Sequence, residues 1–88
     1  MVGGLVRSLA GHDKGDVFCV VGEEEGFLLL ADGKRRPLGS PKRKKRMHTE
    51  AAGEFDHPAL QKLSRREPVT DNEIRRALAA FRAQSRRV

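Results

Sequence analysis

The chain has 88 residues, of which 38% are hydrophobic and 34% are charged, with four Phe and neither Trp nor Tyr. Because a chain of this size forms one domain at most and buries only roughly 60–65% of its unfolded surface, a two-domain enzyme is excluded and an enclosed substrate cavity is disfavoured. Lys and Arg number 18 against 12 Asp and Glu, so the net charge of +6 indicates a polyanionic partner, either nucleic acid or an acidic membrane surface.

Cysteine content and hydropathy exclude further classes of protein. The single Cys19 excludes an internal disulfide framework, and together with three scattered histidines it predicts no metal site. The longest apolar runs, Val17–Val21 and Phe27–Ala31, are far shorter than the roughly 18 residues of a membrane span. The first residues do not form a basic region followed by a long apolar stretch, so no signal peptide is expected. We therefore expect a protein of the cytosol or nucleus that has no membrane partner.

Short strands separated by turn residues are predicted for residues 1–39. The first three expected strands are Leu5–Leu9, Asp16–Val21 and Phe27–Ala31, with glycine-bounded turns at Gly11–Gly15 and Gly22–Gly26. Asp32-Gly33 then predicts a type I′ hairpin, because that turn needs positive φ at two positions. Lys34–Leu38 would be the paired fourth strand, and Lys44–His48 a short fifth.

The alternation of side chains along these strands carries further information. In the second strand Val17, Cys19 and Val21 point to one face, and Phe18 and Val20 to the other. Both faces are therefore apolar, whereas a sheet with one wet face would alternate apolar and polar residues. We expect one face to line a barrel interior and the other to be covered by a C-terminal helix.

That helix has a marked start. Thr70-Asp71-Asn72-Glu73 fits the capping box, in which the Thr hydroxyl and the Glu carboxylate bond each other's backbone amides. A single apolar stripe follows at three- and four-residue steps and predicts a helix over residues 70–83; its members are Ile74, Ala77, Leu78 and Phe81. The expected organisation is thus a barrel with a basic run in residues 1–48, an irregular linker in 49–69 with a short helix starting at Pro58, and a helical segment in 70–88.

Basic residues cluster between residues 34 and 46. Eight cations and no acid lie within thirteen residues, in Lys34-Arg35-Arg36 and Lys42-Arg43-Lys44-Lys45-Arg46. Positive charges so close together on one surface repel each other unless a polyanion neutralises them. This pattern favours a phosphate-binding patch over a solvated loop. Residues 41–46 also resemble a short nuclear-localisation signal, although the same cations would serve RNA equally well.

The Gly11–Gly15 turn is a second candidate. Glycine allows positive φ and close approach of a phosphate to the backbone, and His12 and Lys14 would add donors beside it. The alternative is an ordinary β-turn. No combination of acid, base, nucleophile and metal ligands can be assembled from the sequence, so an enzyme is not expected.

Val6–Val21 resembles a KOW motif. The continuation, Leu30–Leu38 with the following Pro-Lys-Arg-Lys-Lys, is similar to the KOW domain of eukaryotic-type large-subunit ribosomal proteins. It is also similar to the small bacterial KOW-domain RNA-binding proteins that are related to them. Val69–Phe81 is also similar to the C-terminal TxxEIRxAL segment of the bacterial proteins. The resemblance implies a small SH3-like β-barrel that binds RNA through the motif loop and the adjacent basic residues, with Gly15 permitting the tight bend of the motif.

The sequence therefore predicts a mainly β fold, a KOW-type SH3-like barrel with a C-terminal α-helical tail. The expected function is non-enzymatic RNA binding in the cytoplasm, at the ribosome and in translation, without a cofactor and with ribosomal RNA and ribosomal proteins as partners. The alternative is a protein-interaction module that docks an acidic partner surface. The expected RNA-binding residues are Arg7, Gly11, His12, Lys14, Gly15, Lys34, Arg35, Arg36, Lys42, Arg43, Lys44, Lys45 and Arg46.

Overall fold

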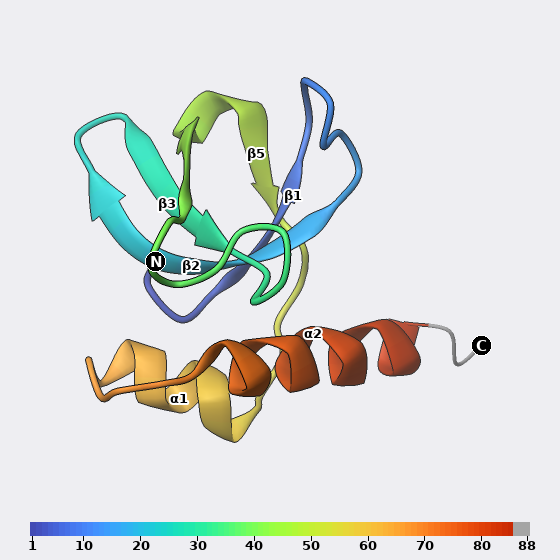
Figure 1. Cartoon of the computed structure of the whole chain (residues 1–88). Coiled ribbons are helices and arrows are strands. Elements are labelled where there is room, and N and C mark those ends of the chain that lie inside the picture. The colour runs from blue at the N-terminus through green and yellow to red at the C-terminus, as the bar shows by residue number, and fades with distance from the viewer. Residues whose placement is uncertain (86–88) are drawn as a thin grey trace.

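The computed structural model describes residues 1–85, so the last three residues of the expected helical segment 70–88 lie outside the described residues. A strongly curled antiparallel sheet lies on a pair of helices (Figure 1). The elements in chain order are β1 (Leu5–Ser8), β2 (Val17–Glu24), β3 (Phe27–Ala31), β4 (Lys42–Lys45), the 3₁₀ turn η1 (Arg46–His48), β5 (Thr49–Ala51), α1 (Pro58–Ser64) and α2 (Asp71–Ser85).

The strand order is β4-β3-β2-β1-β5, so the sheet ends at β4 on one side and at β5 on the other. The two edge strands follow each other in the chain and are joined by η1. The expected barrel is not closed, because in the described chain these edges are not hydrogen-bonded to each other. The expectation of a mainly β fold is supported only in part: strands hold 28% of the residues, and the 15-residue α2 and 7-residue α1 make the fold mixed.

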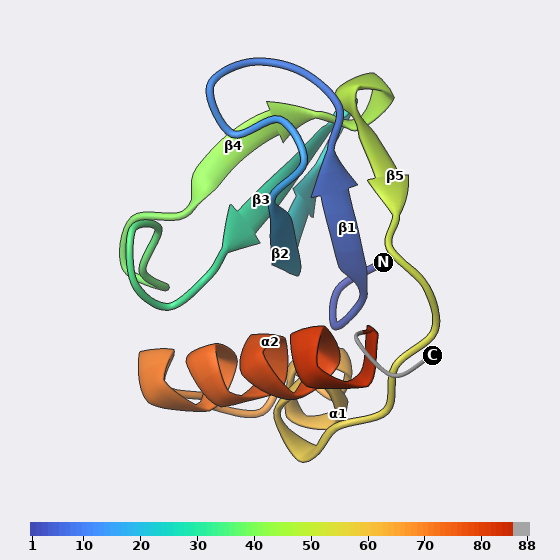
Figure 2. The same cartoon turned by 90° about the vertical axis from the view of Figure 1, so that its right-hand side faces the viewer.

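The sheet buries an apolar cluster on each face, as the side-chain alternation predicts. Inside the curl lies one cluster, made of Val6, Phe18, Val20, Leu28 and Leu30. On the opposite face Leu5 and Cys19 pack against α1 and α2, with Val17 and Val21 at the margin. Figure 2 shows both helices running beneath this face. The prediction that a C-terminal helix covers the sheet is confirmed, and α1 shares that role.

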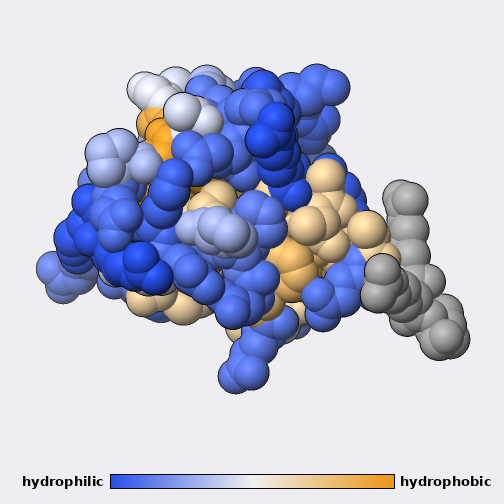
Figure 3. Space-filling model, turned by 90° about the horizontal axis from the view of Figure 1, so that it is seen from below, coloured by the Kyte–Doolittle hydropathy of each residue, from blue (hydrophilic) through white to orange (hydrophobic). Residues whose placement is uncertain are grey.

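The helices turn their apolar residues toward the sheet. In α2 the buried residues are Ile74, Ala77, Leu78 and Phe81, the stripe expected from the sequence. Seen from the helical side, the surface is mainly hydrophilic, with a smaller apolar area (Figure 3). Within residues 1–85, neither helix is long and apolar enough to cross a membrane.

The expected hairpin at Asp32-Gly33 is wrong. Gly33 does have positive φ, at 79°, but residues 34–38 form a loop instead of a paired strand. The Asp32 carboxylate accepts hydrogen bonds from the backbone amides of Lys34 (2.9 Å) and Arg36 (2.8 Å), which curls the chain on itself. Such side-chain capture of nearby amides competes with strand pairing. The partner of β3 is instead β4, with Phe27 opposite Lys45 and Leu30 opposite Lys42.

The sheet also extends beyond the boundary expected at residue 48. Thr49–Ala51 forms β5 and pairs with β1, where Arg7 lies opposite Glu50. The segment 49–69 is therefore not a continuous irregular linker. Its three-residue strand carries two exposed positions and no apolar alternation, so the sequence gives no signal for it. The short helix expected at Pro58 is confirmed as α1.

The capping box that begins α2 is confirmed. The Thr70 hydroxyl accepts from the Glu73 amide at 3.2 Å, and the Glu73 carboxylate accepts from the Thr70 amide at 3.1 Å. The Thr70 carbonyl accepts the first intrahelical bond, from the Ile74 amide, at 3.1 Å. Val69, before the cap, packs against the same apolar cluster as Ile74, as in a hydrophobic staple.

Thr70→Ala should lower the free energy of unfolding by about 1 kcal/mol, because the Glu73 amide loses its acceptor. Denaturant unfolding checks the value. Thr70→Ser is the matched control, because it keeps the hydroxyl and should retain most of the stability. Helical NMR shifts that begin well before residue 69 would contradict the assignment of this cap.

Candidate nucleic-acid interface

The turn between β1 and β2 is held in shape by its own backbone. Gly11 and Gly15 have φ of 85° and 91°, in the left-handed region that favours glycine. The Gly15 amide donates to the Ser8 carbonyl at 2.8 Å, and the Lys14 amide donates to the Gly11 carbonyl at 3.2 Å. The result is a compact loop that exposes His12 and Lys14.

Asp13 points from this turn toward β4 and binds two lysines. Its carboxylate lies 2.6 Å from the Lys44 Nζ and 2.7 Å from the Lys42 Nζ, and it accepts a 2.7 Å hydrogen bond from the Ser8 hydroxyl. Lys44 also donates to the Ala10 carbonyl at 2.7 Å. We call this group the Asp13 clamp. It ties the Gly11–Gly15 turn to β4.

The contacts of the clamp change the pKa of the Asp13 carboxyl. Burial alone would raise the pKa of the Asp13 carboxyl. Hydrogen bonds from Lys42, Lys44 and Ser8 outweigh that effect and hold the pKa well below its ordinary value. Asp13 is therefore ionised at neutral pH and fixes both ammonium groups.

Two of the predicted RNA-binding residues, Lys42 and Lys44, are held within the clamp. Lys44 is only 8% exposed, and its ammonium is used inside the clamp, so it does not face solvent as a phosphate ligand would. Lys42 is half-buried and shares the same carboxylate. Most of the basic run forms the strand β4 (Lys42–Lys45), which starts two residues before the short strand expected at Lys44–His48, and alternate residues on a strand face opposite sides. The exposed members of the run are therefore Arg43, Lys45 and Arg46.

Arg43 is already engaged on the outer face of the sheet. Its Nε lies 2.5 Å from the Glu24 carboxylate, and its guanidinium stacks 3.5 Å above the centroid of the Phe27 ring. Lys45 and Arg46 line an apolar hollow beside Phe27 and Met47. These cations lie at the end of the sheet opposite the helices, where η1 and the β2–β3 turn meet (Figure 1).

The loop after β3 presents Lys34, Arg35 and Arg36 as exposed side chains. Asp32 curls the loop, and α2 anchors it: Arg75 donates to the Gly33 carbonyl at 2.5 Å, and the Asp71 carboxylate accepts from the Leu38 amide at 2.7 Å. A Cβ on Gly33 would clash with the Asp71 carbonyl oxygen. Only glycine allows the helix to approach so closely, so α2 fixes the position of the basic loop.

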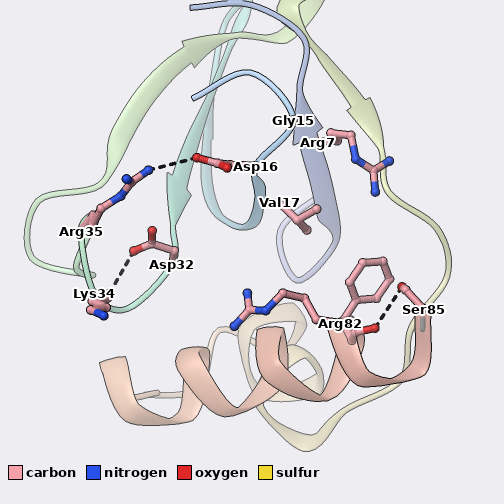
Figure 4. A pocket seen from close by; sticks show the side chains of 10 residues that line it. Arg7, Gly15, Asp16, Val17, Asp32, Lys34, Arg35, Arg82 and Ser85 are labelled. Atoms are coloured by element: carbon pink, nitrogen blue, oxygen red, sulfur yellow. Dashed lines mark hydrogen bonds and ion pairs between the residues drawn. The ribbon is translucent and has the colours of Figure 1, made fainter. Parts of the chain in front are cut away.

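A cleft of about 600 Å³ lies between the turn, the loop and α2 (Figure 4). We call it the helix cleft; its lining residues are Arg7, Gly15, Asp16, Val17, Asp32, Lys34, Arg35, Phe81, Arg82 and Ser85. It therefore gathers predicted site residues from β1, the motif turn and the basic loop. Arg35 also forms an ion pair with Asp16 at 3.0 Å.

A second hollow of about 290 Å³ adjoins the helix cleft and shares Arg35 and Asp32 with it. His12, Arg36 and Lys42 line it from the turn, the loop and β4. Two predicted site residues, Gly11 and Lys14, are exposed on the turn and line neither space. The predicted residues thus form a main group around the turn and the basic loop, while Lys45 and Arg46 line a separate hollow.

Sequence reasoning missed Arg82 and Asp13. For Arg82 the available signal is its position one residue after Phe81, the last member of the apolar stripe, which places it at the border of the face that packs on the sheet. Asp13 has no such signal, because its lysine partners are 29 and 31 residues away in sequence. Comparison of the chain with protein-family models and with curated proteins returns no match.

Proposed function

We propose that this chain is a non-enzymatic RNA-binding protein of the cytoplasm that acts in translation on ribosomal RNA, with a KOW-type, SH3-like sheet as its binding domain. The KOW-like residues coincide with β1, the Gly11–Gly15 turn, β2 and the basic loop, which are the elements around the helix cleft. The curled sheet with its own interior cluster supports an SH3-like fold.

The observation that carries the proposal is the convergence of cations on the motif turn. The Arg35–Asp16 ion pair holds the basic loop beside the turn, and α2 anchors that loop, so the exposed cations of the turn and of the loop lie together. Closely spaced cations bind the phosphates of a nucleic-acid backbone and release its counterions. Few aromatic side chains are exposed, so recognition rests on phosphate contacts and RNA shape more than on base stacking. Ribosomal proteins are the further partners that we propose.

The test replaces exposed cations and spares the clamp. Changing the whole run 42–46 would also remove Lys44 and Lys42, and would confuse loss of binding with loss of structure. Lys34→Ser, Arg35→Ser and Arg36→Ser together should weaken binding to ribosomal RNA by about tenfold or more at ~150 mM salt. Fluorescence anisotropy with labelled ribosomal RNA fragments measures the affinity, and Lys14→Glu should add a further loss.

The matched control removes three exposed cations that line neither the helix cleft nor the hollow beside it. Arg65→Ser, Arg66→Asn and Arg76→Ser change the net charge equally and should leave affinity within about twofold. For the parent, which neutralises roughly four to six phosphates, log K should fall with log salt at a slope of about −3 to −5. Equal losses in both triple variants, or a slope near zero, would reject the proposal and favour a module that docks an acidic protein surface.

A further inference from the structure

The helix cleft holds cations that the protein does not neutralise. Within residues 1–85, the side chains of Lys34 and Arg82 form no ion pair, and Arg7 reaches only the exposed Glu50, at 3.7 Å. Arg35 is paired with Asp16, although both side chains remain largely exposed, at 71% and 47%. Cations from β1, the basic loop and α2 thus converge on one space. This arrangement is unfavourable unless an anion enters it.

The cleft also has an apolar wall. The half-buried Val17 of β2 and the buried Phe81 of α2 line it together with the cations. Its volume of about 600 Å³ falls in the range of roughly 300–1,000 Å³ that accommodates small organic ligands, and it is far too small for a double helix. An isolated phosphate would satisfy the cations but leave the apolar wall unused. A nucleotide supplies both an anionic phosphate and a flat, largely apolar base.

The two sides of the cleft differ in charge. Figure 4 shows Arg7 and Ser85 toward β1 and the end of α2, whereas Asp16, Asp32 and Arg35 lie toward the basic loop. The Arg82 guanidinium points toward the basic loop, and Lys34 lines both the cleft and an adjoining hollow with it, so a phosphate fits between these two cations. The carboxylates of Asp16 and Asp32, which also lie toward this loop, are acceptors for amino or hydroxyl groups of a nucleotide.

The cleft is open toward the RNA surface of the proposed function. Gly15 of the motif turn lines it, and a Cβ at that position would meet no atom within 4 Å. The backbone of an RNA strand that lies on the turn can therefore pass directly into the cleft. We propose that the helix cleft binds one unpaired nucleotide of the RNA, with its phosphate between Lys34 and Arg82. This inference rests on the proposed function and makes α2 part of the recognition surface.

The test compares two RNA duplexes that differ only by one bulged nucleotide. Arg82→Gln removes one phosphate ligand, and Arg76→Gln is the matched control, because Arg76 is exposed on the same helix and does not line the cleft. The parent should bind the bulged duplex at least about fivefold more tightly than the continuous one. Arg82→Gln should abolish this preference and leave affinity for the continuous duplex within about twofold. Arg76→Gln should retain the preference, and equal melting temperatures would show that all variants are folded.

Three outcomes would overturn the inference: a parent without preference for the bulged duplex, an Arg82→Gln variant that keeps the preference, and one that weakens both duplexes equally. Each of these leaves the proposed function standing if the triple variant of residues 34–36 still loses affinity for both duplexes. If the parent binds neither duplex, both proposals fall. A 2-aminopurine base in the bulge adds a direct readout, because its fluorescence should change on binding to the parent and not on binding to Arg82→Gln.

Discussion

Leu78→Ala should lower the free energy of unfolding by about 2–4 kcal/mol, because the side chain lies where α2 meets the sheet. Leu78 is only 2% exposed and belongs to the cluster that joins α2 to Leu5 and Cys19 of the sheet. Its truncation leaves a cavity that neither the sheet nor the helix can readily fill. For a chain of this size, such a loss corresponds to a fall in melting temperature of roughly 10 °C or more.

Leu9→Ala is the matched control for this experiment. It makes the same chemical change at a leucine that is 41% exposed, so little buried surface is lost. The free energy of unfolding should change by less than about 1 kcal/mol. Equal melting temperatures for the parent and Leu78→Ala would mean that α2 does not dock on the sheet, and the helix cleft would then lose one of its walls.

The parts of this fold that the sequence predicts correctly depend on local or periodic signals. The capping box of Thr70 needs only residues three apart, and the stripe of α2 needs only the helical repeat. The alternation in β2 predicts two buried faces, because a residue pointing to either side of that strand is apolar. These signals are enough to predict the sheet, its interior cluster and the covering helix from the order of residues alone.

The incorrect parts depend on contacts that are distant in sequence or compete locally. Asp32-Gly33 has the composition of a hairpin turn, yet the Asp32 carboxylate captures the Lys34 and Arg36 amides and turns those residues into a loop. β5 has no apolar alternation and exists because β1 offers an unpaired edge. In the candidate site, charge density locates the basic loop and the run, but the division between exposed and clamped lysines follows from the register of β4 against β3. Neither that register nor the position of Arg82 beside the helix cleft can be predicted from neighbouring residues in the sequence.

Asp13→Ala should lower the free energy of unfolding by about 3 kcal/mol. The change leaves the Lys44 ammonium, 8% exposed, with the Ala10 carbonyl as its remaining partner, and an uncompensated buried charge costs about 3–5 kcal/mol. The lower end applies because the clamp lies near the surface, where Lys42 is 25% exposed and water can enter. Denaturant unfolding of the variant measures the loss.

Asp16→Ala is the control, since Asp16 ends the same turn and its pair with Arg35 is exposed, so its removal should cost less than about 1 kcal/mol. Adding Lys44→Met to Asp13→Ala should recover part of the stability, because the double variant no longer buries an unpaired charge. Equal losses for Asp13→Ala and Asp16→Ala would contradict a clamp that organises the turn.

The stabilisation from the Asp13 clamp should also depend on pH, in a direction set by the pKa of Asp13. The pKa of Asp13 is lower in the folded chain than its ordinary value of 3.8, so protonation favours the unfolded chain. The stabilisation from the clamp is therefore complete above about pH 5, and it is lost as the pH falls below 4 toward the lower folded value. The difference in unfolding free energy between the parent and Asp13→Asn should be largest at neutral pH and shrink in acid. A difference that stays constant down to pH ~2.5 would show that the charge of Asp13 does not hold the motif turn against β4.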